Sequence, residues 1–106
     1  MDKLIQILDE IGLPWAYSHF AKGEVPDFPY LCVQIGNNDP FSADGIVYQD
    51  FLDVDLELYT DHKDLEAERK VQDVLTKHEI YYARSETWIS SEELYQVWFS
   101  FEMEDE

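Results

Sequence analysis

The chain alternates strictly between apolar and acidic residues from Leu52 to Tyr59, where it reads LDVDLELY. A period of two is that of a β-strand with one buried and one solvated face. The apolar positions of this strand are therefore expected in the core. The opposite face carries the carboxylates of Asp53, Asp55 and Glu57.

Two segments have the apolar spacing of amphipathic helices. The first begins at Asp2 and ends at Gly12, just before Pro14, and its apolar positions are Leu4, Ile5, Leu8 and Ile11. The second is predicted from Asp61 to Lys77, because residues 60–64 (TDHKD) supply an N-cap and the acidic first turn that a helix dipole favours. Its inward stripe comprises Ala67, Val71, Val74, Leu75 and His78.

Four segments read as strands, at 30–36, 46–59, 80–85 and 94–103. The first two form a predicted hairpin joined by a long polar loop at 36–45. Glu86 to Ile89 is placed at the turn between the last two strands, with Trp88 as a core anchor. The aromatic segment 15–29 is irregular, and its first part is compatible with an extended edge strand.

The resulting order is α-β-β-α-β-β. It predicts an α+β fold in which two helices pack on an antiparallel sheet of about four strands. At 106 residues the chain is long enough for one core, so residues 1–106 are expected to form a single domain. No internal repeat or linker divides it.

The charge balance changes what this fold can do. The chain has 24 acidic and 7 basic residues, a formal net charge of -17. Neither 23–61 nor 85–106 contains Lys or Arg, and four of the seven bases lie between Lys63 and Lys77. Because phosphate recognition needs a basic surface, sequence-specific DNA or RNA binding is not expected.

The residues that usually carry chemistry are sparse. The single cysteine, Cys32, lies in an apolar run and is expected as a buried free thiol, and His19, His62 and His78 lack metal-ligand spacing. No nucleophile elbow or glycine-rich phosphate loop is present. We therefore expect no enzyme activity, metal, cofactor or small-molecule substrate. No apolar run approaches membrane-spanning length, which indicates a cytoplasmic protein without membrane contact.

Four stretches carry a family resemblance: residues 13–17 (LPWAY), 43–48 (ADGIVY), 57–64 (ELYTDHKD) and 85–89 (SETWI). Together they resemble small prophage structural proteins of Gram-positive hosts, similar to the siphophage tail-completion or tail-terminator class at the head-tail joint. The resemblance implies a ring, commonly hexameric, that contacts itself and tail-tube or connector proteins. It implies assembly in the host cytoplasm and a final place in the virion. Connector and minor capsid roles remain open.

A ring through which DNA slides should not bind it, and a carboxylate-lined channel repels phosphate. Asp53, Asp55 and Glu57 are the candidate lumen residues, although their face could also turn outward or against a neighbour. Ring closure needs two different contact patches on each subunit. The candidates are Asn37, Asn38, Asp39 and Phe41 in the long loop, followed by Trp15, Tyr17 and Phe28.

A second hypothesis is a DNA mimic that occupies the basic groove of a host nucleic-acid-binding protein. Alternate strand residues lie about 6.8 Å apart, close to the phosphate step of a DNA strand. The row from Asp53 to Glu57 provides three such charges. A mimic would bind a basic host protein, whereas a ring component would bind itself or the tail tube.

Overall fold

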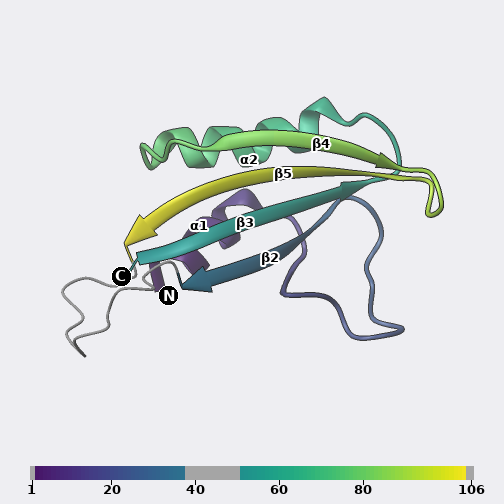
Figure 1. Ribbon diagram of the computed structural model, residues 1–106, viewed down its shortest axis with the longest axis horizontal. Coiled ribbons are helices and arrows are strands. Elements are labelled where there is room, and N and C mark those ends of the chain that lie inside the picture. Colours follow the sequence, from purple (N-terminus) through teal and green to yellow (C-terminus); the bar gives the residue numbers. More distant parts are fainter. Residues whose placement is uncertain (1, 38–50, 105–106) are drawn as a thin grey trace.

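The computed structural model describes residues 2–37 and 51–104 (Figure 1). This part of the chain contains two helices and five strands. In chain order they are α1 (Asp2–Ile11), β1 (Trp15–Tyr17), β2 (Tyr30–Asn37), β3 (Phe51–Thr60), α2 (Leu65–Lys77), β4 (Ala83–Ile89) and β5 (Leu94–Glu104). The α+β class predicted from the sequence is confirmed.

The sheet has the strand order β1-β2-β3-β5-β4 and is mixed. β1 runs parallel to β2, and the other neighbouring pairs are antiparallel. The four-stranded, wholly antiparallel sheet was therefore wrong in detail, and the order becomes α-β-β-β-α-β-β. The fifth strand is β1, an edge strand with which the first part of segment 15–29 was compatible. Its parallel pairing is held where Leu31 N donates to Pro14 O (2.9 Å) and Ser18 N donates to Val33 O (2.8 Å). The connection at 18–29 brings the chain back to run in the same direction.

Both helices cover the same face of the sheet (Figure 1), and the core lies between the helices and that face. On the sheet side it contains Leu56 and Leu58 of β3 and Phe99 of β5, all fully buried. On α1 the buried positions are Leu4, Ile7, Leu8 and Ile11. Ile5, which was predicted on the apolar stripe, is exposed, and Ile7 takes that place because it completes the spacing of one helical face. Gly12 (φ 82°) ends the helix as expected.

The second helix begins four residues later than predicted. Thr60 is the last residue of β3, and its hydroxyl donates to the His62 carbonyl (2.7 Å). The N-cap is Asp64, whose Oδ1 accepts a hydrogen bond from Ala67 N (3.0 Å). Four positions of the predicted inward stripe are confirmed. Ala67, Val71 and Leu75 are buried, and Val74 packs against the core.

The strand predicted at 80–85 was also misplaced, since β4 covers Ala83–Ile89. Ile80 and Tyr82 are apolar because they pack against the core before the strand begins, and the Tyr82 ring contacts Phe99. Glu86 to Ile89 lies within β4 and not in a turn. Trp88 is exposed and contacts the Tyr95 ring (4.8 Å between centroids), so it does not anchor the core.

Candidate functional site: the acidic open face

The face of the sheet opposite the helices carries the acidic row of β3. Residues on β5 pair directly with it: Asp53 with Glu102, Asp55 with Ser100, and Glu57 with Trp98. Asp53, Glu102 and Trp98 are exposed, while Asp55 and Glu57 are half-buried. The strand positions that alternate onto this face include no Lys or Arg. We call this surface the acidic open face.

Neutral donors hold two of its carboxylates in place. Ser100 Oγ donates to Asp55 Oδ1 (2.5 Å) from the neighbouring strand. Glu57 Oε1 accepts from both Gln34 Nε2 and the Tyr59 hydroxyl, at 3.2 Å in each case. These bonds orient the two carboxylates and leave their charge intact. Asp53 lies opposite Glu102 across the two strands, so two carboxylates come from neighbouring positions of the same face.

Tyr59 links this row to the rest of the face. Its hydroxyl accepts a hydrogen bond from Gln96 Nε2 (2.7 Å) while it donates to Glu57. Burial raises the pKa of Tyr59 above its ordinary value, and the nearby Glu57 carboxylate adds to that effect. The phenol therefore remains a neutral donor throughout the physiological range.

An aromatic stack closes one end of the acidic open face. The rings of Tyr30 and Tyr59 stack at 5.3 Å between centroids, Phe28 stacks on Tyr30 at 5.5 Å, and Phe20 meets Tyr30 edge-on at 5.4 Å. The segment between β1 and β2 therefore packs on its own sheet at this end. Cys32 lies here as a buried free thiol, as predicted, and burial raises its pKa.

The proposed subunit-contact residues separate into three groups. Trp15 packs against the core, and its Nε1 donates to Asp9 Oδ1 (3.2 Å). Its side chain is therefore engaged within its own subunit. Tyr17 and Phe28 remain exposed. Asn37 is the last residue of β2. The side chain of Asn37 and the residues Asn38, Asp39 and Phe41 lie outside the described part of the chain.

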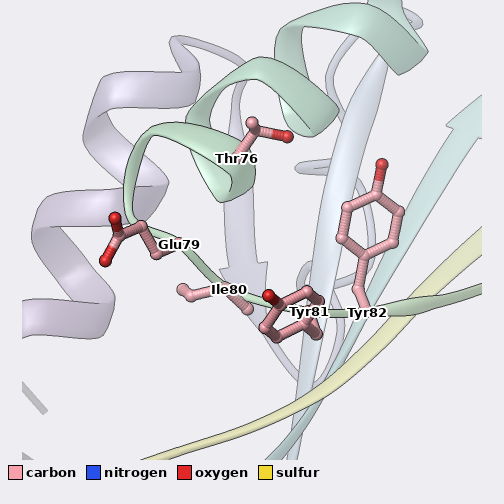
Figure 2. A pocket seen from close by; sticks show the side chains of 5 residues that line it. All are labelled: Thr76, Glu79, Ile80, Tyr81 and Tyr82. Atoms are coloured by element: carbon pink, nitrogen blue, oxygen red, sulfur yellow. The ribbon is translucent and has the colours of Figure 1, made fainter.

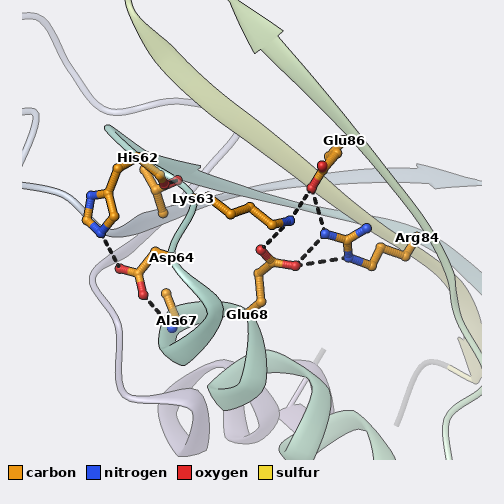
Figure 3. Close-up of polar contacts among 8 residues, drawn as sticks. His62, Lys63, Asp64, Ala67, Glu68, Arg84 and Glu86 are labelled. Carbon is orange, nitrogen blue, oxygen red and sulfur yellow. Dashed lines mark hydrogen bonds and ion pairs between the residues drawn. The ribbon is translucent and has the colours of Figure 1, made fainter.

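A second polar cluster, on the helix side, had no counterpart in the sequence predictions (Figure 3). Glu68 of α2 is buried, and its carboxylate contacts Lys63 Nζ (2.9 Å) and Arg84 Nε (3.0 Å). Arg84 Nη2 also contacts both Glu68 and Glu86, the latter at 2.7 Å, and Lys63 contacts Glu86. The neighbouring Lys63 and Arg84 lower the pKa of Glu86. We call these four residues the ion cluster.

The ion cluster ties the start of α2 to β4 with two positive and two negative charges. It therefore uses two of the seven bases internally and adds nothing to the net charge. No local sequence motif predicts the ion cluster, because its members come from a loop, a helix and a strand. The alternation of Arg84 and Glu86 along a strand was its only sequence signal.

Metal-binding chemistry finds little support in residues 2–37 and 51–104. Within them no group of three or more His, Cys, Asp or Glu side chains could hold a metal ion. The three histidines lie apart: His19 contacts Ser18, His62 contacts Asp61, and His78 contacts Glu10. In the same part of the chain, no helix has the length and apolar character needed to cross a membrane.

Comparison of the chain with protein-family models, curated proteins and solved structures finds no match in any of the three.

Proposed function

We propose that the protein is a non-enzymatic phage structural component that completes the tail at the head-tail joint. In this role copies of the chain form a ring, commonly of six subunits, on the tail tube. The observation that carries the proposal is the acidic open face, in which Asp53, Asp55 and Glu57 line one side of the sheet without a basic strand residue beside them. The resemblance of four sequence stretches to tail-terminator proteins supplies the biological setting.

The physical argument concerns passage of DNA. A channel that binds phosphate would retain the DNA, whereas fixed carboxylates repel it and keep it mobile. Hydrogen bonds from Ser100 and Gln34 hold two of the carboxylates toward this face without neutralising them. An inward orientation of the acidic open face would therefore give a lumen through which DNA slides.

Ring closure requires a contact between two different patches of neighbouring subunits. Tyr17 of the edge strand β1 and Phe28, which stacks on Tyr30, are exposed and are the described residues that best fit one patch. The loop at 36–45 remains a predicted second patch. Because each subunit carries a net charge of -17, repulsion opposes assembly and salt should favour it. The protein would assemble in the host cytoplasm and remain in the virion.

Light scattering coupled to size-exclusion chromatography tests this proposal. The chain is measured at low and high salt, alone and with purified tail-tube protein of the same prophage. We expect a species of roughly six subunits on the tube or at high salt. A monomer under every condition would contradict the proposal, and a tight complex with a basic host DNA-binding protein would favour the DNA-mimic alternative.

Charge variants then test the lumen. The face variant neutralises the row on β3 by Asp53→Asn, Asp55→Asn and Glu57→Gln. The matched control removes the same charge at exposed positions of the two helices, which cover the opposite face, by Asp2→Asn, Asp73→Asn and Glu66→Gln. We expect the assembled face variant to retain double-stranded DNA at low salt and the control assembly to release it. Equal retention by the two assemblies would argue against a lumen lined by this face.

A further inference from the structure

A pocket of about 430 Å³ lies at the end of the acidic open face that the aromatic stack closes, and we call it the end pocket. Tyr30 and Cys32 of β2 and Tyr59 of β3 line it from the sheet. The connection at 18–29 lines it from one side, and Glu92 lines it from the turn between β4 and β5. Both segments lie at the same end of the sheet (Figure 1). Small-molecule sites in proteins have volumes of about 300–1,000 Å³, so the end pocket has room for a small organic group.

Hydrogen bonds and a ring contact hold the connection at 18–29 against the sheet. Gln34 Nε2 donates to the Ser18 carbonyl (2.7 Å), and Ser18 N donates to Val33 O (2.8 Å). The Phe20 ring meets Tyr30 edge-on, with 5.4 Å between the centroids. The walls of the end pocket are therefore formed in the free chain, and a ligand would not bear the cost of ordering them.

The charges around the end pocket are almost all negative. No Lys or Arg lines it, and most of its lining comes from 23–61 and 85–106, the two stretches that contain no base. Lys22 is exposed and lies outside the lining, and His19 is the one lining side chain that can take up a positive charge. The exposed carboxylate of Glu92 is part of the lining. Glu57 lies beside it, because the Tyr59 hydroxyl donates to Glu57 (3.2 Å).

Three ionisable groups of the end pocket reflect these surroundings. Burial raises the pKa of Tyr30, and Cys32 and Glu92 add to that effect. Burial and the Glu57 carboxylate raise the pKa of both Cys32 and Tyr59. All three groups are therefore neutral near neutral pH. The carboxylates that oppose a negative charge in this place favour a positive one.

The aromatic lining indicates which kind of cation fits. The faces of aromatic rings carry partial negative charge and attract ammonium and guanidinium groups, and Phe20, Tyr30 and Tyr59 all line the end pocket. A metal ion needs several oxygen, nitrogen or sulfur ligands instead. No suitable group of His, Cys, Asp or Glu occurs among residues 2–37 and 51–104. An organic cation therefore matches both the rings and the carboxylates.

The pocket shown in Figure 2 lacks this charge selection. It has a volume of about 600 Å³ and lies between the last turn of α2 and the chain that leads into β4. It also combines aromatic rings with a carboxylate, but residues 63–84 hold five of the seven bases. Charge therefore does not select an occupant there. Its lining residues are Thr76, Glu79, Ile80, Tyr81 and Tyr82.

We propose that the end pocket binds an organic cation, an alkylammonium or guanidinium group, with its charge beside Glu92 and its carbon atoms against Phe20 and Tyr30. A free amine and a Lys or Arg side chain of a partner protein both carry such a group, and the experiment separates these two sources. The inference does not depend on the proposed function, since the end pocket lies within one chain.

The test is an NMR titration of the ¹⁵N-labelled chain with choline. It is run at about 0.15 M salt, which screens general attraction to an acidic protein, and at about pH 8, where histidine is uncharged. We expect saturable shifts of the backbone amides of Phe20, Tyr30 and Glu92. The alcohol in which a tert-butyl group replaces the trimethylammonium group has the same shape without the charge, and should bind about tenfold more weakly. Equal binding of this alcohol, or shifts confined to the row from Asp53 to Glu57, would overturn the proposal.

A blocked Gly-Arg-Gly peptide and free ethylguanidinium then separate the two sources. Binding of the peptide at least as tight as that of ethylguanidinium would assign the end pocket to a side chain of a partner protein. Exclusion of the peptide would assign it to a free small cation. The same peptide with citrulline, the neutral analogue of arginine, should not bind. Binding of neither guanidinium compound nor choline would overturn the proposal.

Paired variants locate the bound cation. Glu92→Gln removes the lining carboxylate and should weaken choline binding about threefold, whereas Glu93→Gln changes the same charge in the same turn outside the lining and should have little effect. Phe20→Leu removes a lining ring and should weaken binding about tenfold. Trp98→Leu removes an exposed ring of the acidic open face that does not line the pocket, and should leave binding unchanged.

The Glu92 and Glu93 pair remains informative if the Phe20 variant loosens the connection at 18–29, because both glutamates are exposed. Equal effects of these two variants, or a loss with Trp98→Leu as large as that with Phe20→Leu, would place the cation outside the end pocket and contradict the inference.

Discussion

Removing the carboxylate of Glu68 should destabilise the protein by about 2 kcal/mol, a value between that of a surface ion pair and that of a fully buried one. Glu68 is 4% exposed and accepts charged hydrogen bonds from both cations of the ion cluster. Such bonds contribute about 1.5–3 kcal/mol each when fully made. Lys63 and Arg84 retain Glu86 as a partner, and their side chains are 40% and 31% exposed, so water recovers much of the loss.

The assay is urea or thermal unfolding of Glu68→Ala at neutral pH, with Glu66→Ala as the matched control on an exposed position of the same helix. A loss of about 2 kcal/mol corresponds to a melting temperature lower by roughly 10 °C in a domain of this size, while the control should change stability by no more than about 0.5 kcal/mol. A double-mutant cycle with Arg84→Ala should give a coupling of about 1 kcal/mol. Equal stability of Glu68→Ala and Glu66→Ala would refute the role of the ion cluster in joining α2 to β4.

Three further predictions concern the helices. Hydrogen bonds from Gln6, His78 and Lys77 lower the pKa of Glu10 from 4.5 to about 2, so the contribution of Glu10 to stability is complete above pH 4.5 and is lost as the pH falls through 2. In unfolding experiments the wild type should therefore be more stable than Glu10→Gln at pH 5, and the difference should shrink toward pH 2. Leu75→Ala, at a fully buried position, should cost about 2–5 kcal/mol in denaturant unfolding. Asp64→Ala should cost about 1 kcal/mol and reduce helical protection in hydrogen exchange at the start of α2, because it removes the N-cap.

The sequence predicted those elements whose pattern reflects one buried and one solvated face. The alternation along β3 and the spacing along α2 both arise from packing against a single core, and both were found. The pattern gave a wrong strand boundary where apolar residues pack on the core without belonging to a strand. Ile80 and Tyr82 pack on the core outside any strand, whereas β4 is mostly polar because it lies at an edge.

Contacts between distant segments were harder to foresee. The three-residue β1 is too short for a periodic signal, and its parallel pairing depends on how residues 18–29 fold back. The ion cluster joins residues up to 23 positions apart, so only the packing of α2 on β4 brings them together. The acidic row was visible in the sequence because it lies within one strand. Its position opposite both helices required the structure.

Carboxyl labelling can show whether the acidic open face turns toward the lumen of an assembled ring. The chain is treated with a carbodiimide and an amine, free and assembled on the tail tube, and labelling of Asp53, Asp55 and Glu57 is compared by mass spectrometry. A lumen predicts that a small amine labels the three residues equally in both states, and that an amine coupled to a polymer too large to enter the ring labels them in the free chain only. Protection from the small amine in the assembly would place this face against a neighbour, and labelling by the large amine in the assembly would place it outside the ring; either result would rule out a lumen lined by these carboxylates.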